Sequence, residues 1–222
     1  MSDGSRLVRG AITGSGASAS VTVATPPTAG NVLIAFGNYV GTGTPTFSDN
    51  LSSTWTVYTT TSALYNSSGN SIYAAYRVAV SGDSALTSIT TASGTVQGMT
   101  YLELSGAATG ITNAVATNNQ TGATSLTTAA FTTGAAGMVI TCVGNGTGGN
   151  GGATAWTGTH VMTSVATSTT RCYAGYYSSA AGESAQTYTA NWTTSRTVNG
   201  ALTINVGPSG AVNNGAGFLM VL

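Results

Sequence analysis

The sequence is short of charge. Its 222 residues hold five Arg and no Lys, against five Asp and Glu, so charged residues make up 5% and the formal net charge is zero. Nucleic-acid binding needs clustered Lys and Arg against phosphates, and this composition excludes a basic interface of that kind. An acidic disordered chain is also excluded, because hydrophobic residues make up 41%.

Cysteine and long apolar runs are scarce as well. Cys142 and Cys172 are too few for a disulfide scaffold, and we expect either two buried thiols or a pair that joins neighbouring strands. No segment approaches the run of about 18 apolar residues that a membrane helix needs. Residues 1–16 also lack the apolar core of a secretory signal. We therefore expect a protein that is made in a cytoplasm and does not enter a membrane.

Small residues dominate what is present. The chain contains 41 Thr and 31 Gly. A Lys-free surface rich in Thr, Ser and Gly is typical of proteins that work outside cells. A virion component satisfies both expectations, because it is made without a signal and leaves the host by lysis.

Short strand-like runs recur along the whole chain. They are rich in Val, Ile, Tyr and Thr, they are bounded by Gly, Asn, Ser or Pro, and helical periodicity is absent. We expect strands at residues 18–24, 31–39, 54–60, 71–80, 86–91, 97–104, 124–131, 138–143, 160–167, 171–177, 185–192 and 200–206. Many short strands at such spacings predict an all-β sandwich or barrel.

The chain also repeats itself. AGNVLIAFGN at 29–38 aligns without gaps on AGMVITCVGN at 136–145, an offset of 107 (136 minus 29). Two later blocks follow in the same order, YAAY on YAGY and VQGMTYLELSG on VNGALTINVGP. The order of the blocks predicts two similar halves, 20–106 and 122–208, joined by 107–121.

Each half has few bulky side chains, so we expect its own core to be thin. Packing the halves face to face would then give one sandwich with about 10 Å between sheets. The expected organisation is an N-terminal arm at 1–17, one β-sandwich at 18–208, and a C-terminal spacer with an apolar tail at 209–222.

The order of these motifs resembles a known family. The succession PPTAGNVLIAFGNY, IYAAYRVAVSGDSALTSIT, MTYLELSG, TTAAFTTGAAGMVITCVGN and YTANWTTSRTVNGALTINV is similar to a jelly-roll-like β-sandwich module of phage virion proteins and secreted bacterial multidomain proteins. The likeness runs from Val21 to Val206 and implies a jelly-roll-like β-sandwich with internal duplication. Family members sit inside larger proteins, so the near-complete coverage here implies a stand-alone accessory subunit. Such motifs specify a fold and leave the function open.

Few residues suit catalysis or metal binding. A Ser-His-acid triad would need the single histidine, His160, and no G-x-S-x-G motif accompanies it. Zinc would need three or four ligands, and Cys142, Cys172 and His160 are the soft ligands present. The SDN segment at 48–50 has one carboxylate, so we interpret it as an Asx turn and not a calcium site. We expect no catalytic residue, metal or cofactor.

Two acids keep a polysaccharide depolymerase open as an alternative. Asp83 and Glu183 occupy matching turns, SGDSA and AGESA, and an internal twofold would bring the two carboxylates together. The simpler interpretation is that both are solvated turn residues. Glu103 lies in a strand-like run, where we expect a partner such as Arg77 or Arg196.

Aromatic residues near loops offer a second alternative, carbohydrate binding. Possible glycan contacts are Trp55, Tyr58 and Trp156, with Tyr39 and Tyr65, in or near Gly, Ser and Thr-rich turns. An exposed ring there would stack on a sugar. The opposing interpretation is that the tryptophans fill the core.

The chain ends are the expected assembly contacts. An apolar terminus either docks onto another subunit or forms a last strand of its own fold. At the other end, two arginines in a Gly and Ser-rich arm would position the chain on an acidic surface. The residues concerned are Arg6, Arg9, Phe218, Leu219, Met220, Val221 and Leu222.

Low charge also favours assembly, because an uncharged exterior associates unless neighbours cover it. We therefore expect a homo-oligomer, a trimer or a dimer. The predicted function is that of a non-enzymatic phage virion structural protein, a capsid decoration or head-fibre protein that stabilises or decorates the shell. Its partners would be itself, the major capsid or another virion protein, and host glycans, without nucleic acid or membrane.

Overall fold

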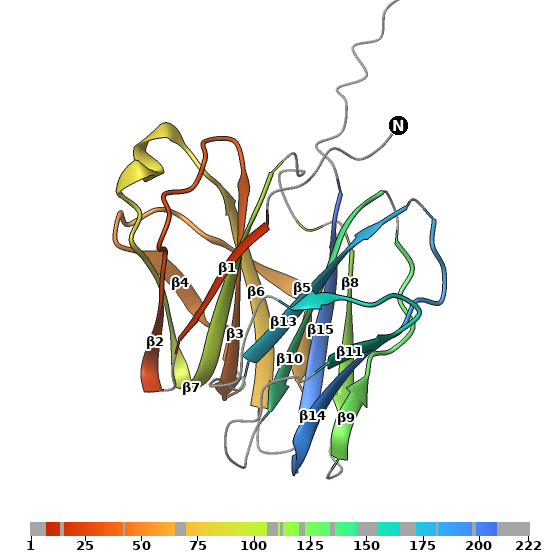
Figure 1. The fold of residues 1–222 in the computed structure, drawn as a ribbon. Helices are drawn as coiled ribbons and strands as arrows, with labels where there is room; N and C mark the ends of the chain where they lie inside the picture. Colours follow the sequence, from red (N-terminus) through yellow and green to blue (C-terminus); the bar gives the residue numbers. More distant parts are fainter. Residues whose placement is uncertain are drawn as a thin grey trace, which may run out of the picture.

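The computed structural model describes residues 8–13, 16–41, 43–64, 70–105, 111, 113–119, 123–133, 136–145, 155–164, 172–180, 182–196 and 199–207. Within these residues the chain forms fifteen β-strands and one short 3-10 helix (Figure 1). The strands build three antiparallel sheets that pack in layers. The prediction of an all-β sandwich is confirmed.

The first half of the chain forms a seven-stranded sheet, called here the large sheet. Its main path runs β1-β7-β3-β6-β5, and β2 and β4 also pair with β7. The 3-10 helix η1 (Ser81–Ala85) connects β6 to β7. The strands are β1 (Val8–Thr13), β2 (Gly16–Thr22), β3 (Val32–Val40), β4 (Thr46–Asp49), β5 (Thr56–Leu64), β6 (Asn70–Val78) and β7 (Ser88–Leu104). At 17 residues, β7 is long enough to pair with four other strands.

The second half forms two smaller sheets. The middle sheet has the order β12-β13-β10-β15-β8, and the outer sheet has the order β11-β14-β9. The middle sheet contains β8 (Asn113–Asn119), β10 (Gly137–Asn145), β12 (Thr163–Ser164), β13 (Cys172–Ser179) and β15 (Asn199–Val206). The outer sheet contains β9 (Ala123–Thr127), β11 (Ala155–Gly158) and β14 (Tyr188–Arg196). In Figure 1 the red-to-yellow strands lie on one side and the green-to-blue strands on the other.

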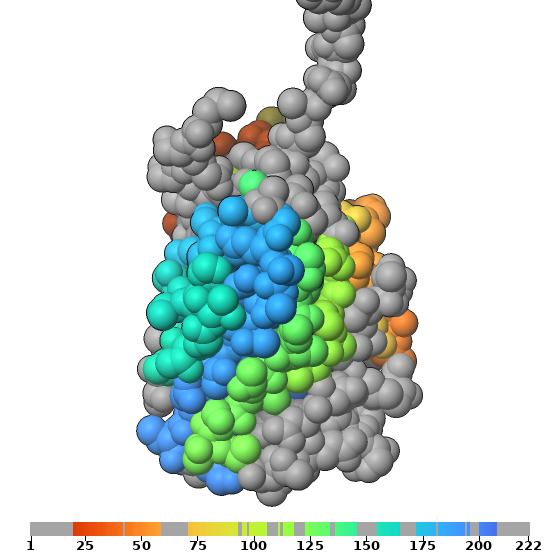
Figure 2. All heavy atoms as spheres, turned by 90° about the vertical axis from the view of Figure 1, so that its right-hand side faces the viewer, coloured from red at the N-terminus to blue at the C-terminus, as the bar shows by residue number. Residues whose placement is uncertain are grey.

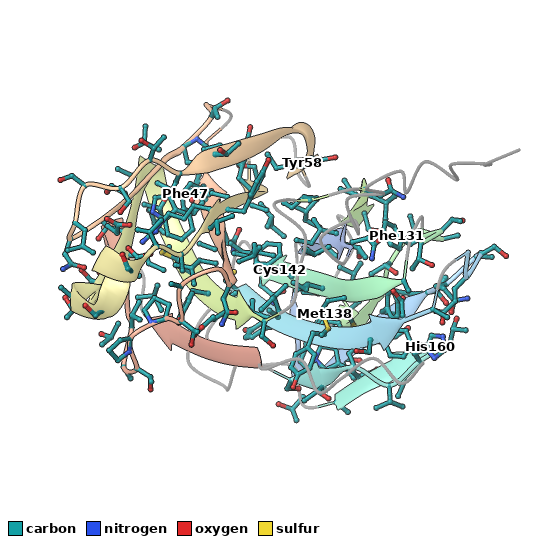
Figure 3. The ribbon with its side chains drawn as sticks, turned by 90° about the horizontal axis from the view of Figure 1, so that it is seen from above. Phe47, Tyr58, Phe131, Met138, Cys142 and His160 are labelled. Atoms are coloured by element: carbon teal, nitrogen blue, oxygen red, sulfur yellow. The ribbon has the colours of Figure 1, made fainter. Side chains whose placement is uncertain are left out.

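Three buried clusters hold the layers together. The shared core joins the large and middle sheets through Val32, Ile34, Phe36, Ile72, Ala74, Leu102, Leu104, Met138, Ile140, Cys142, Cys172, Ala174, Leu202, Ile204 and Val206. The opposite face of the large sheet carries a second cluster, and a third fills the space between the middle and outer sheets. Figure 3 shows Cys142 between the two halves, with Phe47 in the first half and Phe131 in the second.

Each half therefore has a substantial core of its own, and the expectation of thin cores is wrong. Aromatic residues make up only 8% of the chain, but they are concentrated in these two clusters. Each aromatic side chain buries about 150–250 Å², so a few of them compensate for many small neighbours. The aromatic members are Tyr39, Phe47, Trp55, Tyr73 and Tyr101 in the first half, and Phe131, Trp156, Tyr173, Tyr188 and Trp192 in the second.

The two halves share a pairing pattern. In the large sheet β3 lies between β6 and β7, and in the middle sheet β10 lies between β13 and β15. Phe36 pairs with Ala74, and Cys142 pairs with Ala174. The pairings make Cys142 the register equivalent of Phe36, an offset of 106 (142 minus 36) and not the 107 of the aligned letters.

This difference of one residue changes the face of the sheet. Val32 lies in the shared core, whereas Val139, its equivalent in the letter alignment, lies in the core between the middle and outer sheets. Gly37-Asn38 and Gly144-Asn145, which end the aligned segments, match as letters but do not occupy equivalent positions in the two sheets. The pairing pattern is the one that a duplication would give, and the duplication itself stays a prediction.

Two segments that the sequence placed outside the sheets are strands. The expected arm at 1–17 contains β1, which pairs with β7, and β2 begins at Gly16. The expected connection at 107–121 contains β8, which pairs with β15. Both β1 and β8 are edge strands with few bulky apolar residues, and they pair because a neighbouring strand offers unpaired backbone groups.

Candidate functional site

A buried charge cluster lies at one end of the large sheet. The guanidinium of Arg77, on β6, is bidentate to Asp83, with Nη1 2.6 Å from Oδ2 and Nη2 3.0 Å from Oδ1. Its Nη2 also lies 3.0 Å from Oδ2 of Asp49. The same guanidinium lies over the ring of Trp55, 5.3 Å from the centroid. One arginine thus neutralises two carboxylates and covers an aromatic ring.

The turn after β4 holds Asp49 in place. Its Oδ1 accepts hydrogen bonds from the backbone N–H of Leu51 and Ser53, and its Oδ2 accepts one from Nε1 of Trp55. The predicted Asx turn at this aspartate is confirmed by the bond from Leu51. Burial pushes the pKa of Asp49 up, but the hydrogen bonds from Ser53 and Trp55 and the charge of Arg77 outweigh it and hold the pKa below 3.8.

Asp83 is a structural residue as well. It is 1% exposed, and its Oδ2 also accepts a hydrogen bond from the N–H of Val80. The interpretation of Asp83 as a solvated turn residue is therefore wrong. Both carboxylate oxygens of Asp83 are bound by Arg77 inside the protein, so Asp83 does not fit a solvent-accessible general acid paired with Glu183.

Glu103 accepts hydrogen bonds from the segment that precedes β3. Its Oε1 accepts hydrogen bonds from the backbone N–H of Thr28 and from Nδ2 of Asn31. Arg77 is engaged by the two aspartates, so the expected Glu103–Arg77 pair is wrong. The side chain of Arg196 lies outside the described residues, and the register partner of Glu103 on β1 is Arg9.

The second polar cluster lies in the other half, around the only histidine. His160 stacks on Tyr177 with ring centroids 3.9 Å apart, and its Nε2 lies 3.3 Å from Oε2 of Glu183. The hydroxyl of Tyr177 and the N–H of Ala180 both donate to Oε1 of Glu183. The side chains of His160 and Glu183 are 30% and 18% exposed, so solvent reaches the cluster. Figure 3 shows His160 far from Phe47 of the first half.

This arrangement differs from a hydrolase site. Among the described residues, the side-chain partners of His160 are Glu183 and Tyr177, and neither is the nucleophile of a Ser-His-acid triad. Burial first, and then the hydrogen bond and the charge of Glu183, raise the pKa of Tyr177 to about 12. The described part of the chain contains no group of three His, Cys, Asp or Glu residues that would hold a metal ion.

The aromatic residues expected to bind glycans are mostly internal. Trp55 and Trp156 are 7% and 4% exposed and belong to the cores of their halves. Tyr39 is buried too, and Tyr58 packs against the shared core. Tyr65 lies outside the described residues. Neither tryptophan presents a face to solvent, so sugar stacking on Trp55 or Trp156 has no geometric basis.

Most of the expected assembly contacts fall outside the described residues. These are Arg6 and the terminal segment 218–222. Arg9 lies within β1 as part of the large sheet, so it does not belong to a separate arm.

Sequence reasoning missed the exposed face of the outer sheet, which is a grid of small polar side chains. Thr189 pairs with Thr157 on one side and with Thr127 on the other. The hydroxyls of Thr127 and Thr189 lie 2.8 Å apart, and Nδ2 of Asn191 donates to Oγ1 of Thr157 at 3.2 Å. Figure 2 shows β11, β14 and β9 side by side on this face. The alternation YTANW at 188–192, with Tyr, Ala and Trp inward and Thr and Asn outward, was the available signal.

The described surface is almost free of formal charge. Arg77, Asp49, Asp83 and Glu103 are all buried, and Glu183 is partly covered by its partners. These five are the charged side chains that the structure describes. Of the charged side chains that the structure describes, four therefore lie in the interior, and the described surface consists mainly of hydroxyl, amide and methyl groups.

No family model, no curated protein and no solved structure matches the chain. None of the helical residues described belongs to a helix with the length and hydrophobicity to cross a membrane. The chemistry of the described surface is therefore the basis for a functional proposal.

Proposed function

We propose that this protein is a non-enzymatic structural component of a phage virion, a decoration or head-fibre protein on the outside of the shell. The low charge of the described surface carries the proposal. Four of the five charged side chains that the structure describes are buried. The resemblance of its strand motifs to modules of virion proteins supports the same setting.

A neutral exterior suits dense packing between copies. Like charges facing each other across a contact repel, and a surface without them can meet copies of itself in several orientations at low electrostatic cost. Hydroxyl and backbone groups then supply hydrogen bonds at the contact. The proposed partners are further copies of this chain and the major capsid protein.

Electron microscopy tests the proposal. Particles assembled with and without an intact gene for this chain are compared, and we expect a repeated surface density that is lost with the gene and restored when purified protein is added. Particles of identical appearance, or a chain absent from purified particles, would reject the proposal.

Charged variants locate the contact. Thr127→Lys with Thr157→Lys places two charges on the outer sheet, and Thr22→Lys with Thr46→Lys places two on exposed positions of the large sheet. If one face docks onto the particle, its variant loses binding while the other keeps it. Full binding by both variants contradicts docking through either face.

A second candidate is glycan binding at the outer sheet, which the ordered grid of Thr127, Thr157, Thr189 and Asn191 favours. Hydroxyl and amide groups held in fixed positions are suited to the hydroxyls of a neutral polysaccharide. A glycan array with the wild type, Asn191→Ala and the control Thr22→Val tests it. Binding lost only in Asn191→Ala supports this function, and an array without hits rejects it.

A further inference from the structure

The two cysteines meet inside the shared core. Cys142 on β10 and Cys172 on β13 lie on the same face of two paired strands, and their Sγ atoms are 3.0 Å apart. Both residues are 0% exposed. The sulfurs are thus about 1 Å farther apart than the roughly 2.05 Å of a disulfide bond.

The register leaves space for the two sulfurs. Cys172 pairs with Gly144, and Cys142 pairs with Ala174, so the cysteines are diagonal neighbours. Because Gly144 has no side chain, nothing on β10 occupies the position directly across from Cys172. A larger residue at 144 would not fit, since a Cβ there would lie 2.9 Å from Cγ of Asn38.

We propose that Cys142 and Cys172 form an oxidation site, a dithiol that closes to an intramolecular disulfide between β10 and β13. The oxidant is a small disulfide such as oxidised glutathione. This inference stands apart from the proposed virion role, because it depends only on the two sulfurs and their surroundings.

The exchange takes place in two steps. One cysteine thiolate attacks the small disulfide, which gives a mixed disulfide and releases one glutathione thiolate. The second cysteine thiolate attacks the protein sulfur of the mixed disulfide, which forms the Cys142–Cys172 bond and releases the second glutathione. The protein loses two electrons and two protons, and the two glutathione molecules leave as thiols.

The fold assigns the first step to Cys172. It is the first residue of β13, and strand ends open at a lower free-energy cost than strand centres. Cys142 lies in the interior of β10, where burial raises the pKa of its thiol and makes it the poorer first nucleophile. Cys142 is therefore the resolving cysteine, which reacts once its partner carries the mixed disulfide.

The bond would stabilise the second half. It closes a loop between positions 30 residues apart, and a cross-link of that span raises the melting temperature of a chain of this size by about 10 °C. The reduced and oxidised forms should therefore differ measurably in thermal unfolding.

The test uses the full chain, reduced and then incubated with oxidised glutathione under native conditions until its mass is constant. The protein is then unfolded and treated with an alkylating agent, and its mass is measured by mass spectrometry. We expect an unalkylated monomer two hydrogens lighter than the reduced protein, with the higher melting temperature. The matched controls Cys142→Ala and Cys172→Ala should show no oxidant-dependent change in melting temperature.

A parallel sample is refolded from denaturant in a glutathione redox mixture, which gives the sulfurs access before the core closes. A disulfide in this sample also supports the site. Two alkylated thiols in both samples, a stable double glutathione adduct, or disulfide-linked dimers in place of the internal bond would overturn the proposal.

Discussion

Asn38 and Asn145 meet where the two halves of the chain pack together, with Nδ2 of Asn38 donating to the backbone carbonyl oxygen of Asn145 over 3.2 Å. Both residues are 0% exposed. Asn38 lies two residues before the end of β3 in the large sheet, and Asn145 is the last residue of β10 in the middle sheet. This polar contact fixes how the two sheets meet, in a core that is mostly apolar.

Removing the contact should weaken the junction of the sheets. Asn38→Ala deletes the donor and leaves the buried carbonyl of Asn145 without it, which costs about 1–3 kcal/mol. Urea unfolding followed by tryptophan fluorescence measures the loss. A variant as stable as the wild type would show that another donor replaces Asn38.

Gly144 provides a second test of the same junction. A Cβ there would lie 2.9 Å from Cγ of Asn38 and 3.0 Å from Cδ1 of Ile72, so Gly144→Ala should lower the unfolding free energy by about 1–3 kcal/mol. Gly82→Ala is the matched control, because nothing lies within 4 Å of its added Cβ. In the double variant Gly144→Ala with Asn38→Ala, the measured loss of unfolding free energy should be smaller than the sum of the losses in the two single variants. Simple additivity would contradict a clash between these positions.

The buried charge cluster predicts a large effect at Arg77. Arg77→Met leaves two buried carboxylates without their cation and should cost about 3–5 kcal/mol. Adding Asp49→Asn and Asp83→Asn removes the uncompensated charges and should recover most of that loss. Equal stability of the single and triple variants, measured by chemical denaturation, would show that the charges are not coupled.

Acid should unfold the protein partly through Asp49. Its pKa in the folded state lies below 3.8, so its contribution to stability is present above pH 3.8 and is lost as the pH falls through the lower folded value. Unfolding free energies from denaturant titrations at several pH values should therefore drop less steeply in Asp49→Asn than in the wild type. Parallel curves would reject this assignment.

High pH should destabilise the protein through ionisation of Tyr177. Its pKa is raised from 10.0 to about 12 by burial and by Glu183, so its contribution is full below pH 10.0 and is lost as the pH rises toward 12. Subtracting the tyrosinate absorbance titration of Tyr177→Phe from that of the wild type isolates this group. In Glu183→Gln the midpoint should move toward 10.0, and an unchanged midpoint would leave burial as the sole cause.

The sequence predicted the central strands better than the edge strands. β3, β6 and β10 combine β-branched or aromatic residues with clear boundaries, and their predicted ranges agree with the structure. β4 and β11 are only four residues long, too short for a period to show. β1 and β8 contain few bulky apolar residues, and only their neighbours in the sheet identify them as strands.

The candidate sites were less predictable, because they depend on distant pairings. The Asx turn at Asp49 involves residues two positions apart and could be predicted from the local sequence. Arg77 on β6 contacts Asp49 at the end of β4, far away in the sequence, and no local pattern shows this contact. For Trp55 and Trp156, the sequence alone left both burial and exposure open. Both side chains are buried by residues that are distant in the sequence.

The long strand β7 has a consequence for biosynthesis. Its four partners, β1, β2, β3 and β4, all precede it in the chain, so a ribosome must translate almost to Leu104 before their pairing can be completed. Until then the nascent segment exposes strands without their common neighbour, and such long-range pairing folds slowly. Chains truncated before β7 should therefore be captured by chaperones or degraded, and the first half should acquire its fold in one late step of synthesis.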